Sequence, residues 1–250
     1  MRKFGIITMI FATILIGCNT DKSKTEIENS EFSASEKKAA TLTKYLKPFN
    51  PELPTIGLLM YNGVLQSEVI ASSDVFAKLT EDGKRLFNVV SIAETENQIT
   101  TEEGMHFVPD YTFDNCPKLT VLFVPSAYDM YAQVQNEKIV NFIREKDKET
   151  EYTVSNCAGA QLIGESGIAD GKKIVTWIGG GEQLQKDYPN LKVQDDSEVT
   201  FVEDGKYLSS NGNLASYISA LNLLEKMTST EHRKFVESYL YLDRLKNWSE

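Results

Sequence analysis

Short apolar runs alternate with amphipathic stretches through most of the chain. A continuous apolar run covers residues 55–61, and mainly apolar stretches cover residues 87–93 and 119–124. Runs of this length are typical of parallel strands that are buried on both faces of a sheet. Between and after them, residues 67–79 and 136–146 carry apolar side chains at helical spacing. The alternation predicts an α/β fold with a doubly wound, mostly parallel sheet sandwiched by helices.

The second half of the chain continues this pattern. The elements expected there are a strand at 151–154, a strand at 173–177, and helices at 160–165, 182–186 and 212–227. Thr230 is the predicted cap of a C-terminal helix that runs to about Lys246 and carries an aromatic-rich face.

The N-terminus has the pattern of a bacterial export signal. Arg2 and Lys3 precede an apolar stretch at residues 4–16, which is shorter than the ~20 residues that a membrane-spanning helix needs. The stretch ends in Leu15-Ile16-Gly17-Cys18, which resembles a lipobox. We therefore expect residues 1–17 to be a signal peptide and Cys18 to carry lipid that anchors the protein to a membrane of the bacterial cell envelope. An uncleaved membrane anchor is the alternative.

Composition divides the chain after the signal peptide into three segments, and the charge of the chain limits the partners that it can bind. Residues 18–50 are polar and predict a flexible tether, residues 51–227 form the expected domain, and residues 228–250 form the C-terminal helix. Acidic residues outnumber basic ones by 36 to 26, a formal charge of −10. Such a surface repels phosphate backbones, so we expect no nucleic-acid partner.

A candidate nucleophile lies in the pentapeptide Ser155-Asn156-Cys157-Ala158-Gly159. Small residues flank Cys157 between a predicted strand and a predicted helix, which is the pattern of a nucleophile elbow with Cys in place of Ser. A helix N-terminus favours the thiolate form of a cysteine. The alternative is a buried structural cysteine. With Cys18 lipidated, only Cys116 and Cys157 remain, so no disulfide framework is expected.

Several blocks in this order resemble the ThiJ/PfpI superfamily, a branch of the class I glutamine amidotransferase-like fold. The blocks lie at residues 56–59, 63–68, 74–76, 108–114, 121–125, 157–160, 166–173 and 204–212. The resemblance covers about residues 54–227, and the most similar branch is that of the isonitrile hydratases.

This resemblance implies the roles of individual residues. Glu68 would be a protonated acid that donates to the Cys157 thiolate, so the two would form the catalytic pair. The backbone amides of Ala127 and Ala158 would form the oxyanion hole. Trp177, Tyr128 and Ser126 would line the pocket.

The chain also departs from the family pattern. Trp177 stands where many members have His, and Ala158 follows the nucleophile where protease-like members have His. His106 and His232 lie in other segments, so peptidase and glutamine amidotransferase activities are disfavoured. Ser126 and Ala127 stand where the family usually has two glycines.

Three functions remain open at this point. The first is hydratase-like or lyase-like chemistry on a small electrophile through Cys157 and Glu68. The second is a redox-responsive or protective role through Cys157 oxidation by a small oxidant. The third is a non-catalytic, lipid-anchored binding domain. We expect no cofactor and no metal site, because no His/Cys/Asp grouping has zinc-like spacing. A homodimer is left open by the family resemblance.

Overall fold

A seven-stranded sheet in the order β10-β11-β7-β6-β1-β2-β5 forms the centre of the domain. The structure is a computed structural model that describes residues 47–247. The strands of this sheet are β1 (Thr55–Leu59), β2 (Asn88–Ala93), β5 (Tyr111–Thr112), β6 (Val121–Val124), β7 (Tyr152–Asn156), β10 (Phe201–Asp204) and β11 (Tyr207–Ser210). Every neighbouring pair is parallel except β10 and β11. The predicted α/β fold with a mostly parallel sheet is confirmed.

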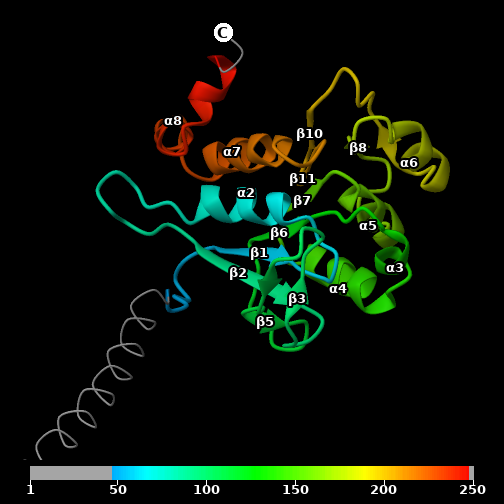
Figure 1. The fold of residues 1–250 in the computed structure, drawn as a ribbon, viewed down its shortest axis with the longest axis horizontal. Helices are drawn as coiled ribbons and strands as arrows, with labels where there is room; N and C mark the ends of the chain where they lie inside the picture. The colour runs from blue at the N-terminus through cyan, green and yellow to red at the C-terminus, as the bar shows by residue number, and fades with distance from the viewer. Residues whose placement is uncertain (1–46, 248–250) are drawn as a thin grey trace, which may run out of the picture. The chain divides into compact units, whose positions relative to one another are not determined.

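Helices cover both faces of this sheet (Figure 1). Helices α2 (Gln66–Phe76) and α7 (Ala215–Met227) pack side by side on one face. Helices α4 (Glu137–Asp147) and α5 (Gly159–Ser166) pack together on the other. The chain runs outward from β1 in both directions, so β1, β6 and β7 end at the same edge, where ligand sites of open α/β sheets form.

The core lies between the sheet and its helices. Strands β1 and β6 are buried along their whole length, as expected for central strands. Phe76 of α2 contacts Phe87 and Phe123 edge-on, with ring centroids 5.2 and 5.8 Å apart. This packing fixes α2, and therefore its first turn, against the sheet.

The C-terminal helix differs from its prediction. Helix α8 (Thr230–Tyr239) is capped by Ser229, whose side chain accepts from the His232 N–H, so Thr230 is not the cap. The helix ends where Tyr241 adopts a φ of +58°, and a 3-10 helix, η1 (Leu242–Asn247), follows. Val236 is fully buried and joins α8 to the hydrophobic core of the same chain.

The remaining elements are short. They are β3 (Ile99–Thr100), β4 (His106–Phe107), β8 (Lys173–Ile174), β9 (Lys192–Val193), α3 (Tyr131–Val134) and α6 (Gly181–Asp187). The predicted signal peptide, Cys18 and most of the predicted tether lie outside the described residues. Within residues 47–247, no helix is long and apolar enough to cross a membrane.

Candidate active site

Cys157 lies on a sharp turn between β7 and α5. Its φ is +53°, a left-handed conformation that is uncommon for a residue with a side chain. Two residues later, a Cβ on Gly159 would meet the Val124 carbonyl oxygen and would lie 2.8 Å from that of Pro125. Only glycine therefore allows α5 to start so close to the end of β6, as the elbow pattern predicts.

Backbone bonds hold the elbow rigidly in place. The Cys157 N–H donates to the Ser210 carbonyl at the end of β11, at 2.9 Å. The Thr176 hydroxyl donates to the Cys157 carbonyl, also at 2.9 Å. These bonds hold the residue in its strained conformation from both sides, which is typical of functional sites.

Glu68 lies beside the elbow, in the first turn of α2. Its side chain is 1 % exposed, and the Cys157 thiol donates a hydrogen bond to its carboxylate. The Ser126 N–H donates to Oε2 at 2.7 Å, while the Ser126 hydroxyl and the Asn213 N–H donate to Oε1 at 3.0 and 3.2 Å. The structure thus brings together the two side chains that the sequence singled out.

Gly212 makes this proximity sterically feasible. Its φ is +84°, and an added Cβ would meet both the Cys157 Cβ and the Glu68 Oε1 atom. The sequence pattern placed Gly212 in a family block and at the start of the helix predicted at 212–227, but α7 begins only at Ala215. Gly212 and Asn213 therefore lie in the turn before α7. A glycine in the sequence indicates such a turn but not which side chains lie beside it.

Burial governs the protonation of this pair. Burial raises the pKa of the Glu68 carboxyl, and the bonds from Ser126, Asn213 and Cys157 oppose that rise. Burial and the neighbouring Glu68 carboxylate raise the pKa of Cys157 to about 11, although Ser126 and the Ala158 N–H favour the thiolate. The expectation that the helix N-terminus would lower the thiol pKa is therefore wrong, because one N–H does not offset desolvation and an adjacent negative charge.

The resemblance implied a protonated Glu68, and two effects on this carboxyl oppose each other. Three N–H and O–H donors converge on its two oxygens, an arrangement that favours the ionised carboxylate. Burial acts in the opposite direction and raises the pKa of Glu68, so the protonation state of this carboxyl stays a prediction.

The two predicted oxyanion donors already have partners. The Ala127 N–H donates to the Met130 Sδ atom at 3.1 Å, and the Ala158 N–H donates to the Cys157 sulfur. Met130 is 4 % exposed, so its thioether occupies the inner side of the predicted hole. Stabilisation of an oxyanion by Ala127 and Ala158 stays a prediction, and for Ala127 it requires exchange of this sulfur for a substrate oxygen.

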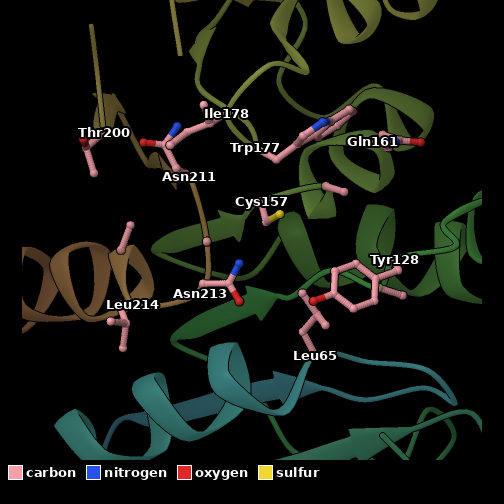
Figure 2. A pocket seen from close by; sticks show the side chains of 14 residues that line it. Leu65, Tyr128, Cys157, Gln161, Trp177, Ile178, Thr200, Asn211, Asn213 and Leu214 are labelled. Atoms are coloured by element: carbon pink, nitrogen blue, oxygen red, sulfur yellow. The ribbon is translucent and has the colours of Figure 1, made fainter. Parts of the chain in front are cut away.

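A pocket of about 740 Å³ opens above the Cys157 sulfur. Figure 2 shows Cys157 between Trp177 on one side and Tyr128 with Leu65 on the other. The Trp177 ring packs on the backbone of Gly180, where an added Cβ would collide with it. Trp177 and Tyr128 line the pocket as predicted, but Ser126 does not: it is fully buried behind the wall, where it binds Glu68.

Charged and metal-binding groups are scarce around this pocket. The residues that line it in the described chain include no Lys, Arg or His. His106 lies on β4 and contacts the Thr100 hydroxyl, and His232 lies on α8. Within residues 47–247, no three His, Cys, Asp or Glu side chains are grouped to hold a metal ion.

Comparison with known proteins agrees with this architecture. The model of the DJ-1/PfpI family matches residues 54–226. The chain belongs to the DJ-1/PfpI family. An isonitrile hydratase from Pseudomonas putida is 26 % identical over 186 residues, which cover 74 % of this chain and 77 % of that enzyme.

Two solved structures illustrate the shared fold. A ThiJ/PfpI family protein from Pseudomonas syringae superposes with a TM-score of 0.68 at 20 % identity, covering 81 % of this chain and 84 % of that one. Drosophila melanogaster DJ-1beta superposes with a TM-score of 0.65 at 20 % identity, covering 76 % of this chain and 98 % of that one. At these identities the likeness supports the fold, and the chemistry rests on the site itself.

Proposed function

We propose that this protein adds water to a small, uncharged electrophilic carbon, such as that of an isonitrile, with Cys157 as nucleophile and Glu68 as proton acceptor and donor. The observation that carries the proposal is the Cys157 thiol at the floor of the pocket with a buried carboxylate as its hydrogen-bond acceptor. The sequence similarity to an isonitrile hydratase supports the same chemistry.

The reaction follows from the pair. Glu68 takes the thiol proton while a sulfur–carbon bond forms and one π bond of the substrate breaks, and the proton then passes to the substrate. Water next adds to the same carbon. Its oxygen bonds to that carbon and one of its protons passes to the substrate nitrogen. The sulfur–carbon bond then breaks as the carbon–oxygen double bond forms, and the second proton of the water passes through Glu68 to sulfur. The net change is the addition of one water molecule. Because Cys157 carries its own proton at rest, Glu68 has to act as the base at the moment of attack.

The pocket favours neutral substrates with an apolar substituent. Tyr128, Trp177, Ile178 and Leu214 supply apolar surface around the sulfur, and no cation of the described chain lines the pocket. A carboxylate or phosphate on the substrate would meet the Glu68 charge without a compensating partner. This geometry also disfavours peptide hydrolysis, since no imidazole lines the pocket to protonate the leaving amine.

The proposal is tested by turnover of aliphatic and aryl isonitriles, with the N-substituted formamide measured by mass spectrometry. We expect product with the wild-type protein and a loss of at least about a thousandfold in Cys157→Ala. Glu68→Gln should also lose most activity, because its amide accepts no proton. Cys116→Ala is the matched control and should retain activity, since Cys116 lies outside the pocket. No formamide from any isonitrile, or formamide that is independent of Cys157, would contradict the proposal.

We propose in addition that lipid on Cys18 anchors the protein to a bacterial membrane, because Cys18 closes a lipobox-like sequence behind a short apolar stretch. Cys18→Ser should move the protein from the membrane fraction to the soluble fraction or leave it unprocessed. Full retention of a correctly sized Cys18→Ser protein in the membrane fraction would exclude this form of anchoring.

A further inference from the structure

The turn between β11 and α7 brings an asparagine side chain to the pocket. Asn213 adopts a φ of +48°, a left-handed conformation that asparagine tolerates better than most residues. Its backbone N–H donates to Oε1 of Glu68 at 3.2 Å. The preceding residue, Gly212, leaves no room for a Cβ beside Cys157. The backbone of Asn213 is therefore fixed next to the two reacting side chains, and strained backbone of this kind collects at functional sites.

The two ends of the Asn213 amide have different surroundings. The Ser67 hydroxyl donates to Oδ1 at 3.3 Å, whereas Nδ2 has no hydrogen-bond partner within residues 47–247. Figure 2 shows the amide nitrogen turned to the Cys157 side and the oxygen turned away from it. Asn213 lines the pocket and is exposed, so a ligand bound at Cys157 can reach this nitrogen. The side chain thus offers the pocket a donor that the protein itself does not use.

The proposed reaction needs such a donor. The Ala127 N–H donates to the Met130 Sδ atom at 3.1 Å, and the Ala158 N–H donates to the Cys157 sulfur. In this arrangement neither amide is available to a substrate oxygen. Donors aimed at the place where negative charge develops are usually a large contribution to catalysis. Since no described residue of the pocket lining is a Lys, Arg or His, the donor has to be a neutral group.

Two other neutral donors that line the pocket are less suited. Nδ2 of Asn211 donates to the Thr176 carbonyl at 2.7 Å and is therefore already engaged. Tyr128 is 76 % exposed, so its hydroxyl is solvated and costs more to hold in place. Asn213 is held both at its backbone, by Glu68, and at its amide oxygen, by Ser67.

We propose that Asn213 is a catalytic residue whose Nδ2 group donates a hydrogen bond to the oxygen atom that water adds to the substrate carbon. The inference rests on the proposed function. When the sulfur–carbon bond breaks and the carbon–oxygen double bond forms, the hydroxyl of the intermediate loses its proton, and this hydrogen bond stabilises the negative charge that develops on the oxygen. Asn213 itself neither gains nor loses a proton. The same bond is retained by the carbonyl oxygen of the formamide product.

The first test is isonitrile hydration by two variants of Asn213. Asn213→Gly removes the amide, suits the positive φ and keeps the backbone N–H that binds Glu68, so the variant should fold. Asn213→Asp keeps the size of the side chain but replaces the donor with an acceptor. We expect kcat to fall about a hundredfold in Asn213→Gly and further in Asn213→Asp. Leu214→Ala is the matched truncation of the next residue. Because Leu214 supplies only apolar surface, its loss should appear in KM more than in kcat.

The second test does not depend on turnover. N-benzylformamide should bind above Cys157 and protect it from alkylation by iodoacetamide, with mass-spectrometric readout at Cys157. Half-protection of Asn213→Gly should need about tenfold more formamide than that of the wild type, because one hydrogen bond is lost. Without formamide, the pH midpoint of alkylation should be the same in both proteins, since the backbone bond from residue 213 to Glu68 remains.

The outcomes separate this inference from the proposed function. Turnover and protection that are both independent of Asn213 would overturn its role and leave the Cys157–Glu68 pair intact. A shifted pH midpoint in Asn213→Gly would also overturn it, because the loss would then act through Glu68. If the wild type hydrates no isonitrile, the proposed function fails, while protection that depends on Asn213 still supports the donor. A loss of kcat in Tyr128→Phe, with none in Asn213→Gly, would assign the donor to the tyrosine hydroxyl instead.

Discussion

At the scale of single residues, the site depends on a position that has no side chain. Gly212 adopts a φ of +84°, and the Cys157 Cβ and the Glu68 carboxylate occupy the space in which a Cβ of residue 212 would lie. An alanine there would be strained by its backbone conformation and would push the two reacting side chains apart.

Gly212→Ala should therefore lower the free energy of unfolding by ~2 kcal/mol or more. Gly167→Ala is the matched control: Gly167 also has a positive φ, +70°, but nothing lies within 4 Å of its added Cβ, so only the backbone strain of about 1 kcal/mol applies. Chemical denaturation measures both. An equal loss of unfolding free energy in the two variants would mean that Cys157 and Glu68 move aside for the added Cβ without destabilising the protein.

Single residues also show where sequence reasoning stops. Cys157 was identifiable from its small neighbours, and Glu68 from a family resemblance. The position of Ser126 was not, because the bond between the Leu65 N–H and the Ser126 carbonyl joins segments that are distant in the chain. No local sequence pattern indicates that the Ser126 side chain faces Glu68 and not the pocket.

At the scale of elements, long periodic segments were predicted well and short ones were not. Helix α4 begins where expected, with Asn136 as its cap accepting from the Lys138 and Ile139 N–H groups. Strands β3, β4 and β5 have two residues each, too few to show a period. The predicted strand at 173–177 ends early as β8. The Val175 N–H donates to the Ser209 hydroxyl instead of to a backbone carbonyl of a neighbouring strand, so the strand pairing ends there.

The same limit explains the C-terminal helix. Its apolar spacing continues past Tyr239, so periodicity alone predicts a helix to about Lys246. Helix α8 ends because Tyr241 adopts a left-handed conformation, and the glycine that usually marks such a helix end is absent from this position. Tyrosine rarely adopts this conformation, and the sequence therefore contained no signal for it.

A buried polar cluster connects elements behind the nucleophile. Asn156, the last residue of β7, accepts from the Ser210 hydroxyl of β11 and the Ser219 hydroxyl of α7 at 2.8 and 2.9 Å. Buried bonds of this kind fix orientation as well as adding stability. The cluster ties the residue before Cys157 to two neighbouring elements, so the elbow is positioned by the sheet and α7 together.

At the scale of the whole molecule, charge and pocket lining act in the same direction. The chain has a formal charge of −10, and the pocket floor holds a thiol against a buried carboxylate. Long-range repulsion and the local charge should both exclude anions from Cys157. The comparison of two reagents that differ mainly in charge isolates this effect.

Iodoacetate should therefore alkylate Cys157 at least about tenfold more slowly than iodoacetamide, after each rate is divided by that for free cysteine. Both reagents need the thiolate, so the ratio cancels the raised thiol pKa. Added salt should narrow the ratio only in part, because it screens the surface charge better than the buried carboxylate. Glu68→Gln should bring the ratio of the two rates closer to one than salt does.

Cys116 is the internal control for this comparison. Burial raises its pKa to about 11, while Lys146 lowers the pKa and Glu149 raises it. Because the charges near Cys116 are of both signs, its ratio of normalised rates should be close to one. Equal normalised rates at Cys157 would mean that the carboxylate is neutralised, and the assignment of a neutral substrate would lose its electrostatic basis.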